Sequence, residues 1–227
     1  MKYLATLLLA ALNLAAHAQS YCASDGQPQP VALLERFINA DCAGCWSDAR
    51  TPEPVKGGLA VDWIVPGSKG DEAPLSAAAM RDGIWRLESL KRGIPPSTDA
   101  SVLRPVKDAH KLRVAHGLPV TGYIGASIEL QPGTGGPWKA WLLLLETIPA
   151  GAEGTLVERN LVRNSLQLEW KAPARGAKAG AFFESRPMNI PEGANPDRMR
   201  VAGWVQDAQG RIHAMALSRC MPVKSTS

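Results

Sequence analysis

Two cysteines that lie three positions apart, Cys42 and Cys45, limit more than any other feature what this chain can fold into. They follow the apolar run VALLERFI, residues 31–38, after a short polar break. An apolar strand, a tight turn and then C-x-x-C at the start of a helix is the layout that opens a thioredoxin-like redox unit. The sequence therefore predicts a strand, a turn and a short helix around this pair.

The first 18 residues have the features of a secretory signal peptide. Lys2 supplies a positive start, residues 4–14 are almost entirely apolar, and Ala-His-Ala at 16–18 forms a cleavage site of small residues. The apolar run is shorter than the roughly 20 residues of a spanning helix, which disfavours a membrane anchor. We expect a periplasmic or secreted protein with no membrane span after cleavage and about 209 mature residues, 227 minus 18.

Charge and motifs exclude several classes of function. The net charge of +4 falls to +3 when Lys2 is removed, and no block of basic residues interleaved with aromatic residues is present, so we expect no nucleic-acid partner. The chain lacks G-x-S-x-G, S-x-x-K, H-E-x-x-H and a phosphate-binding glycine loop. Nothing therefore supports a hydrolase, and we predict no cofactor.

All four cysteines follow the predicted cleavage site, and an oxidising compartment favours disulfides. Four cysteines allow three pairings. Cys22 and Cys220 lie near the two ends of the mature chain, and the ends of a domain are often close together. We therefore predict the disulfides Cys42–Cys45 and Cys22–Cys220.

The hydrophobic pattern changes near residue 120. Before that point, residues 59–65 predict a second strand, and residues 74–92 predict a helix that begins at a proline and ends before Gly93. From residue 123 onward apolar residues recur with a period of two, which predicts β-strands. The predicted strands of this half cover residues 123–130, 138–146, 165–170, 200–206 and 211–218, and the last two flank a hairpin turn.

These patterns together predict an α+β fold. Residues 19–119 would form a thioredoxin-like domain, and residues 120–227 a domain rich in antiparallel β-structure, either one sheet or a small sandwich.

Three chemical roles fit the C-x-x-C pair. In the first, the thiolate of Cys42 exchanges disulfides with other exported proteins, and Cys45 resolves the mixed disulfide. In the second, Cys42–Cys45 is a permanent disulfide of a non-catalytic binding or assembly module. The third role, half of a zinc site, needs two more ligands. The histidines at 110, 116 and 213 lack zinc-finger spacing, so we predict no metal site.

Asp62, in the predicted strand LAVDWIV, is the candidate acid for the cysteine pair. If that strand is buried, its apolar surroundings favour the protonated acid, which could pass a proton to Cys45. The alternative is a solvated aspartate on an edge strand. Arg159 and Arg163 in ERNLVRN could bind an anionic partner, but we interpret them as solvated residues at a strand end that pair with Glu158 and Glu169.

The segment VALLERFINADCAGCWSDA resembles the start of a bacterial exported family, the domain of unknown function 1223. Phe37, Cys42, Cys45 and Asp48 match the layout of that family, and LAVDWIV resembles its next strand. The segments NLVRNSLQLEW and RVAGWVQDAQGRIHAMAL are similar to its C-terminal β region. The resemblance implies a thioredoxin-like half and a β-rich half in an exported protein without a settled activity.

The resemblance also implies a cis-proline that faces the two cysteines. Members of the family usually carry a Thr-Pro-Gln segment for this purpose, and this chain has none. Pro119 in GLPVTG is the nearest candidate, and the pair at 95–96 is another.

Overall fold

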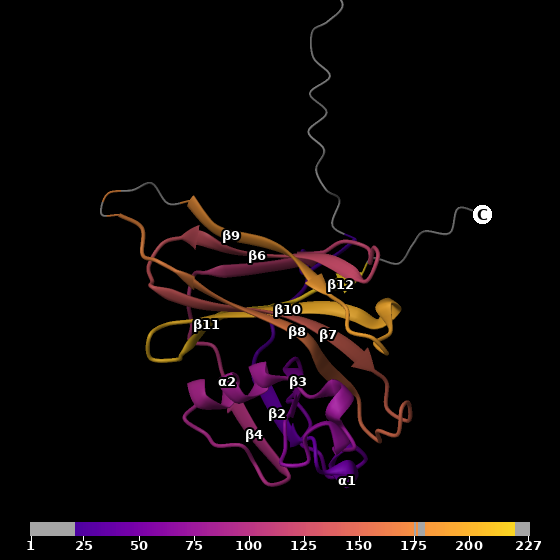
Figure 1. The fold of residues 1–227 in the computed structure, drawn as a ribbon. Coiled ribbons are helices and arrows are strands. Elements are labelled where there is room, and N and C mark those ends of the chain that lie inside the picture. The colour runs from indigo at the N-terminus through magenta and orange to yellow at the C-terminus, as the bar shows by residue number, and fades with distance from the viewer. Residues whose placement is uncertain (1–20, 175, 177–179, 221–227) are drawn as a thin grey trace, which may run out of the picture.

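A computed structural model describes residues 21–174, 176 and 180–220 of the chain. Two β-sheets lie one above the other, and helix α2 lies against part of the larger sheet, near the strands of the first half of the chain (Figure 1). The predicted signal peptide, residues 1–18, lies outside the described residues. Among the helices of the described ranges, none has both the length and the apolar character needed to cross a bilayer.

The smaller sheet has five strands in the order β12-β1-β5-β6-β9, and all of its neighbouring strands run antiparallel. The two strands at or next to its edge, β1 and β12, come from opposite ends of the described chain. Its strands are β1 (Cys22–Ala23), β5 (Lys111–His116), β6 (Tyr123–Gly133), β9 (Gly180–Asn189) and β12 (Arg219–Cys220).

The larger sheet has seven strands in the order β11-β10-β7-β8-β3-β2-β4. Two neighbouring pairs in it, β2 with β3 and β3 with β8, run parallel. Its strands are β2 (Leu33–Asn39), β3 (Leu59–Val65), β4 (Thr98–Leu103), β7 (Trp138–Ile148), β8 (Arg159–Trp170), β10 (Met199–Gln206) and β11 (Ile212–Leu217).

The helices are short. The described residues contain α1 (Ala43–Trp46), α2 (Arg81–Ser89) and the 3-10 turns η1 (Gly70–Glu72), η2 (Ser76–Ala78) and η3 (Pro196–Arg198). The helix predicted over residues 74–92 is thus confirmed only in its second half. The first half leaves helical geometry because the backbone N–H of Met80 donates to the carbonyl of Ile64 at 2.9 Å, which ties the segment to β3.

Strand β7 is buried on both faces because two cores meet on it. Leu142 belongs to the core between the two sheets, together with Ile128 of β6. Trp141 points to the opposite face and packs in a second core that contains Leu87 of α2. At Gly203 of β10 an added Cβ would lie 2.9 Å from the Cδ1 of Ile128 in the other sheet, so only glycine fits without a shift.

The predicted fold class, a thioredoxin-like half followed by a β-rich half, is wrong. The described chain is mainly β-structure. Strands β2, β3 and β4 do not form a separate α+β unit. Strand β3 pairs with β8, and this pairing joins β2, β3 and β4 to β7, β10 and β11 in one sheet. The apolar pattern of residues 59–65 indicated a buried strand, but it carried no information on which strand would occupy the neighbouring position.

Candidate functional site

The C-x-x-C pair lies in a turn that follows β2 directly. At the end of that strand the side-chain amide of Asn39 donates to the carbonyl of Pro95 at 2.8 Å, and its oxygen accepts the N–H of Asp41 at 2.9 Å. Cys42 occupies the N-cap of α1, and Cys45 lies one turn later within it. Both cysteines are half-buried, so the pair is neither enclosed nor fully solvated.

The structure contains both predicted disulfides. Cys42 is bonded to Cys45, and Cys22 is bonded to Cys220. The second bond joins β1 to β12 across directly paired positions. Because the sulfurs of Cys42 and Cys45 bond to each other, they are not available as zinc ligands in this state.

Arg159, the first residue of β8, ties the cysteine turn to the interior. Its guanidinium donates to the carbonyl of Trp46 at 2.8 Å and to the hydroxyl of Thr51 at 3.0 Å, and it contacts the carbonyl of Cys45 at 3.4 Å. The same guanidinium lies 5.1 Å from the ring centre of Trp46, a cation–π contact. Arg159 is fully buried, so the interpretation of this residue as a solvated strand end is wrong.

Asp62 lies at the centre of the buried polar cluster. Its carboxylate accepts hydrogen bonds from the guanidinium of Arg36 at 2.5 Å, from that of Arg159 at 3.0 Å and from the backbone N–H of Asn160 at 3.0 Å. Asp62 is buried, as one of the two sequence interpretations required. Its connection to Cys45 runs through Arg159, whose guanidinium contacts both residues.

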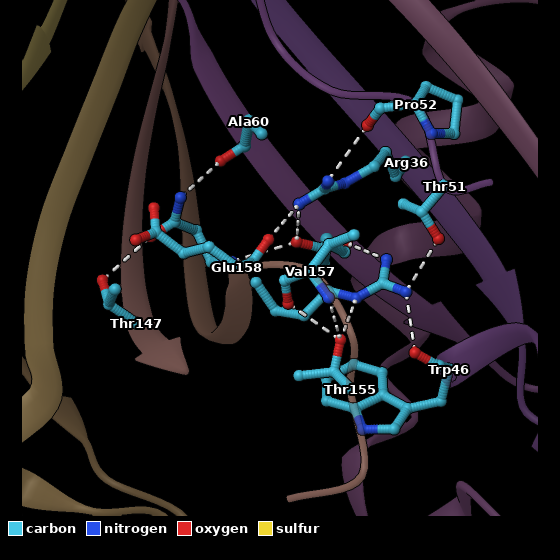
Figure 2. A network of polar contacts seen from close by, with 12 residues as sticks. Arg36, Trp46, Thr51, Pro52, Ala60, Thr147, Thr155, Val157 and Glu158 are labelled. Atoms are coloured by element: carbon cyan, nitrogen blue, oxygen red, sulfur yellow. Dashed lines mark hydrogen bonds and ion pairs between the residues drawn. The ribbon is translucent and has the colours of Figure 1, made fainter. Parts of the chain in front are cut away.

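The two guanidinium groups come from different strands, Arg36 from β2 and Arg159 from β8, and Figure 2 shows Arg36 with its partners Pro52 and Glu158. Arg36 comes from β2 and also donates to the carbonyls of Pro52 at 3.1 Å and Glu158 at 3.2 Å. Burial lowers the pKa of Arg159 from its usual value, and the nearby Asp62 opposes this effect. The guanidinium groups of Arg36 and Arg159 share one carboxylate, that of Asp62, and the carboxylate of Asp48 acts on Arg159 as a further negative charge.

A cavity of about 270 Å³ lies beside this cluster and the disulfide. Cys45, Arg36 and Arg159 line one part of it, and residues 98–100 of β4, the last strand in the order of the seven-stranded sheet, line another. Within the described residues, the buried Nε of Arg36 has no hydrogen-bond partner. The cavity therefore combines access to the disulfide turn, an exposed sheet edge and an unsatisfied cationic donor.

The candidate cis-proline lies elsewhere. Pro119 is in the turn between β5 and β6 of the five-stranded sheet, whereas the cysteine turn follows β2 of the seven-stranded sheet. The cis peptide bonds found in the described ranges precede Pro132 and Pro137, not Pro119. The pair at 95–96 lies closer to the cysteines, since the carbonyl of Pro95 contacts the end of β2.

A larger cavity, about 700 Å³, lies at the opposite end of β8. Trp170 ends β8 there, as Arg159 begins it at the cysteine turn. Trp138 and Gln206 also line this cavity. The charged residues around it are Arg86, Lys91, Lys139, Glu169, Lys171 and Asp207.

Two of those charges are compensated by neighbours. Arg86 makes an ion pair with the buried Glu35 at 2.6 Å, and Asp207 makes one with Arg211 at 2.7 Å. The remaining charges, three lysines and one glutamate, give the cavity a net positive character.

The sequence did contain one signal for the buried cluster. Glu35 and Arg36 stand in the middle of the apolar run VALLERFI, and both are buried in β2. Charged side chains inside a strand that is covered on both faces need buried partners, because an unpaired buried charge costs several kcal/mol, about 3–5. Those partners, Asp62 and Arg86, come from later segments and were not predicted.

No model of a known protein family, no curated protein and no solved structure matches this chain.

Proposed function

We propose that this protein is an exported thiol–disulfide exchange protein and that Cys42–Cys45 is its redox pair. One observation carries the proposal: a half-buried disulfide lies at the N-cap of α1, beside a cavity, and the guanidinium of Arg159 lies against its turn. A cationic neighbourhood stabilises a thiolate relative to a thiol, and the thiolate is the attacking species in exchange. The resemblance of the CAGCWSDA segment to an exported family supports export alone.

Exchange takes place in two steps that conserve electrons. In the oxidised state, a thiolate of a client protein attacks the Sγ of Cys42, and the sulfur of Cys45 leaves as a thiolate. A second client thiolate then attacks the mixed disulfide, so the client gains a disulfide and the pair takes up two electrons. The reverse sequence reduces a client. The cavity along β4, which Cys45 lines, is the proposed docking place for a client segment.

The equilibrium of the purified protein in graded glutathione redox buffers tests this proposal. Alkylation of free thiols followed by peptide mass measurement reports each disulfide separately, and Cys22–Cys220 serves as the internal control. We expect Cys42–Cys45 to equilibrate above about −300 mV, in the range of exchange catalysts, while Cys22–Cys220 stays oxidised. A Cys42–Cys45 bond that resists reduction to potentials below about −300 mV contradicts the proposal.

Trapping a client gives a second, independent measurement. In the Cys45→Ala variant, Cys42 can form a mixed disulfide that no neighbouring thiol resolves. We expect this variant to accumulate mixed disulfides with exported proteins, which a reducing agent releases. The matched Cys42→Ala variant keeps the resolving cysteine and lacks the attacking one, so equal trapping by both variants would contradict the assigned roles.

The larger cavity favours a second candidate function, a binding module in which Cys42–Cys45 only braces the turn. Its lysine-rich border and the rings of Trp138 and Trp170 suit a small anion with an apolar body. The probe 1-anilinonaphthalene-8-sulfonate has this chemistry. Saturable binding at one site that is weakened by Lys139→Glu, and unchanged by Lys111→Glu in the other sheet, would support this function. Binding of the probe that is unchanged in Lys139→Glu would contradict this second function.

A further inference from the structure

Two histidines and two aspartates that are distant in sequence meet beside Trp138. Asp108 and His110 lie in the segment between β4 and β5, and His213 lies in β11. Asp207 lies in the turn between β10 and β11. The side chains of Asp108, His110 and His213 keep between 12 and 19% of their surface exposed, so the cluster is sheltered but reachable from solvent.

The Nδ1 atoms of both histidines converge on one carboxylate. The Nδ1 of His110 lies 2.8 Å from Oδ1 of Asp108, and the Nδ1 of His213 contacts Oδ2 of the same residue. One ligand atom from each of the three side chains lies within 4.8 Å of the other two. Three ligand atoms at such spacing can reach a single ion.

The other nitrogen of each ring also faces an oxygen. The Nε2 of His110 lies 3.2 Å from the carbonyl oxygen of Thr134, and the Nε2 of His213 lies 3.0 Å from Oδ2 of Asp207. A carbonyl and a carboxylate only accept hydrogen bonds, so each Nε2 must carry a hydrogen. In a neutral ring the lone pair of Nδ1 then points at an oxygen of Asp108, and either a second proton on the ring or a metal ion bound by these atoms removes the repulsion.

This arrangement is the usual one around a metal-binding histidine. A histidine that binds a metal through one nitrogen donates the hydrogen of the other to a carboxylate or to a backbone carbonyl. That donation fixes the tautomer and the direction of the ring. Asp207 and Thr134 occupy these two supporting positions around His213 and His110.

The surrounding contacts hold the ligand atoms in place. Both imidazole rings pack edge-on against Trp138, at ring-centre distances of 5.1 Å for His110 and 4.7 Å for His213. Asp207 is held in turn by Arg211, whose Nε donates at 2.7 Å, and by the backbone N–H of Gln209 at 2.9 Å. A site whose ligands are already oriented loses less entropy when it binds an ion.

We propose that Asp108, His110 and His213 form a binding site for a divalent transition-metal ion, Zn²⁺ in the first instance. Two imidazole nitrogens and one carboxylate oxygen suit Zn²⁺ better than the hard cations Mg²⁺ and Ca²⁺, which prefer oxygen ligands. Three protein ligands leave a further coordination position for water or for a bound molecule. Asp207, which supports His213, also lines the 700 Å³ cavity, so the ion would lie next to it.

Calorimetric titration of the tag-free, chelator-treated chain with ZnCl₂ tests the site. We expect one ion per chain, and we expect the variants His110→Asn and His213→Asn each to weaken binding at least tenfold. The matched control is His116→Asn, because His116 lies in the five-stranded sheet and should leave zinc affinity unchanged. Absence of zinc binding, or equal binding by all three variants, would overturn the proposal and leave a cluster held together by protons.

Two further measurements distinguish a lost ligand from a lost fold. Zinc should raise the midpoint of thermal unfolding of the unchanged chain and of His116→Asn, and not that of His213→Asn, because a ligand stabilises only the state that binds it. The variant Asp207→Asn removes the supporting carboxylate and keeps all three ligands, so we expect a 10- to 100-fold loss of affinity with the stoichiometry unchanged. Full zinc affinity in Asp207→Asn would contradict the positioning role.

Discussion

The two disulfides of this protein differ in span, in burial and in their neighbours. Cys22 and Cys220 are 198 residues apart, and their bond joins paired strands at the edge of the five-stranded sheet. Cys42 and Cys45 are three residues apart, and their bond closes a half-buried turn outside the strands. The first bond connects the two ends of the described chain. The second connects residues of one turn, which Arg159 ties to Asp62.

This difference shows what each bond can do. A cross-link restricts the unfolded chain in proportion to the logarithm of the loop that it closes, so a long loop stabilises the fold and a short loop stabilises it much less. Reducing the short loop leaves the strands in register, because its turn stays attached to the interior through Arg159. The fold therefore holds this turn by contacts that do not depend on the Cys42–Cys45 bond.

The largest effect should follow removal of the long-range bond. In the loop-entropy description, Cys22→Ala with Cys220→Ala lowers the free energy of unfolding by about 5 kcal/mol, and Cys42→Ala with Cys45→Ala by about 2 kcal/mol. Urea denaturation of both double variants measures the two losses on the same scale. Equal losses would show that the span of the loop does not distinguish the two bonds.

Breaking the cluster under the short disulfide should have the next largest effect. Asp62→Asn leaves Arg36 and Arg159 buried without their shared anion, which costs about 3–5 kcal/mol. We also expect faster reduction of Cys42–Cys45 by dithiothreitol, with no change at Cys22–Cys220, because the turn loses its anchor. The control is Asp25→Asn, which breaks an exposed pair with Arg113 and should cost less than about 1 kcal/mol. Similar losses in both variants would contradict the structural role of the cluster.

Two glycines near the disulfides should respond in opposite directions. Gly26 follows β1 with a φ of +69°, a conformation that costs a residue with a side chain about 1–2 kcal/mol, so Gly26→Ala should destabilise the fold. Gly44 lies in α1 with open space around its Cα, so Gly44→Ala should stabilise it by about 0.4–1 kcal/mol. Midpoints of urea denaturation compare the two variants. Shifts of the same sign would contradict the backbone conformation described for one of the two glycines.

The smallest effect on stability should come from the protonation of His116, which lies beside the long-range disulfide. Burial lowers the pKa of His116, which lies directly opposite Cys22 in the sheet, and the charge of Arg200 adds to this while a hydrogen bond to Gly117 opposes it. As the pH falls below about 6.5, the unfolded chain binds a proton at His116 while the folded chain does not. The contribution of His116 to the free energy of unfolding is therefore present above about pH 6.5 and is lost at lower pH. Denaturation at pH 8 and pH 5.5 should show a smaller decrease in His116→Gln than in the unchanged chain, and parallel decreases would count against this assignment.

The sequence predicted strands better than their partners. The apolar run at 59–65 coincides with β3, because a buried strand consists mainly of apolar residues. Pairing of β3 with β8 uses backbone groups that almost every residue offers, so no local pattern announces it. For the same reason a thioredoxin-like half was expected where the strands of residues 19–119 are shared between the two sheets.

The sequence predicted the disulfides and named Asp62 as a candidate, but it did not predict the residues that bind Asp62. The disulfides follow from the positions of four cysteines along the chain, which the sequence shows directly. The cluster around Asp62 depends on Arg159, 97 residues later in the chain, which looks from the sequence like any solvated arginine at the start of a strand. The proposed metal ligands Asp108 and His213 are separated by 105 residues, so the spacing rules for local metal motifs could not find them.

The bond between β1 and β12 places the first and last described strands at the same edge of the molecule (Figure 1). Helix α1 lies at the opposite extreme of the same view. A molecule tethered to a surface through either strand would therefore turn the Cys42–Cys45 face outward, toward whatever passes in solution. Immobilised preparations would keep that face accessible whichever of the two ends is chosen for attachment.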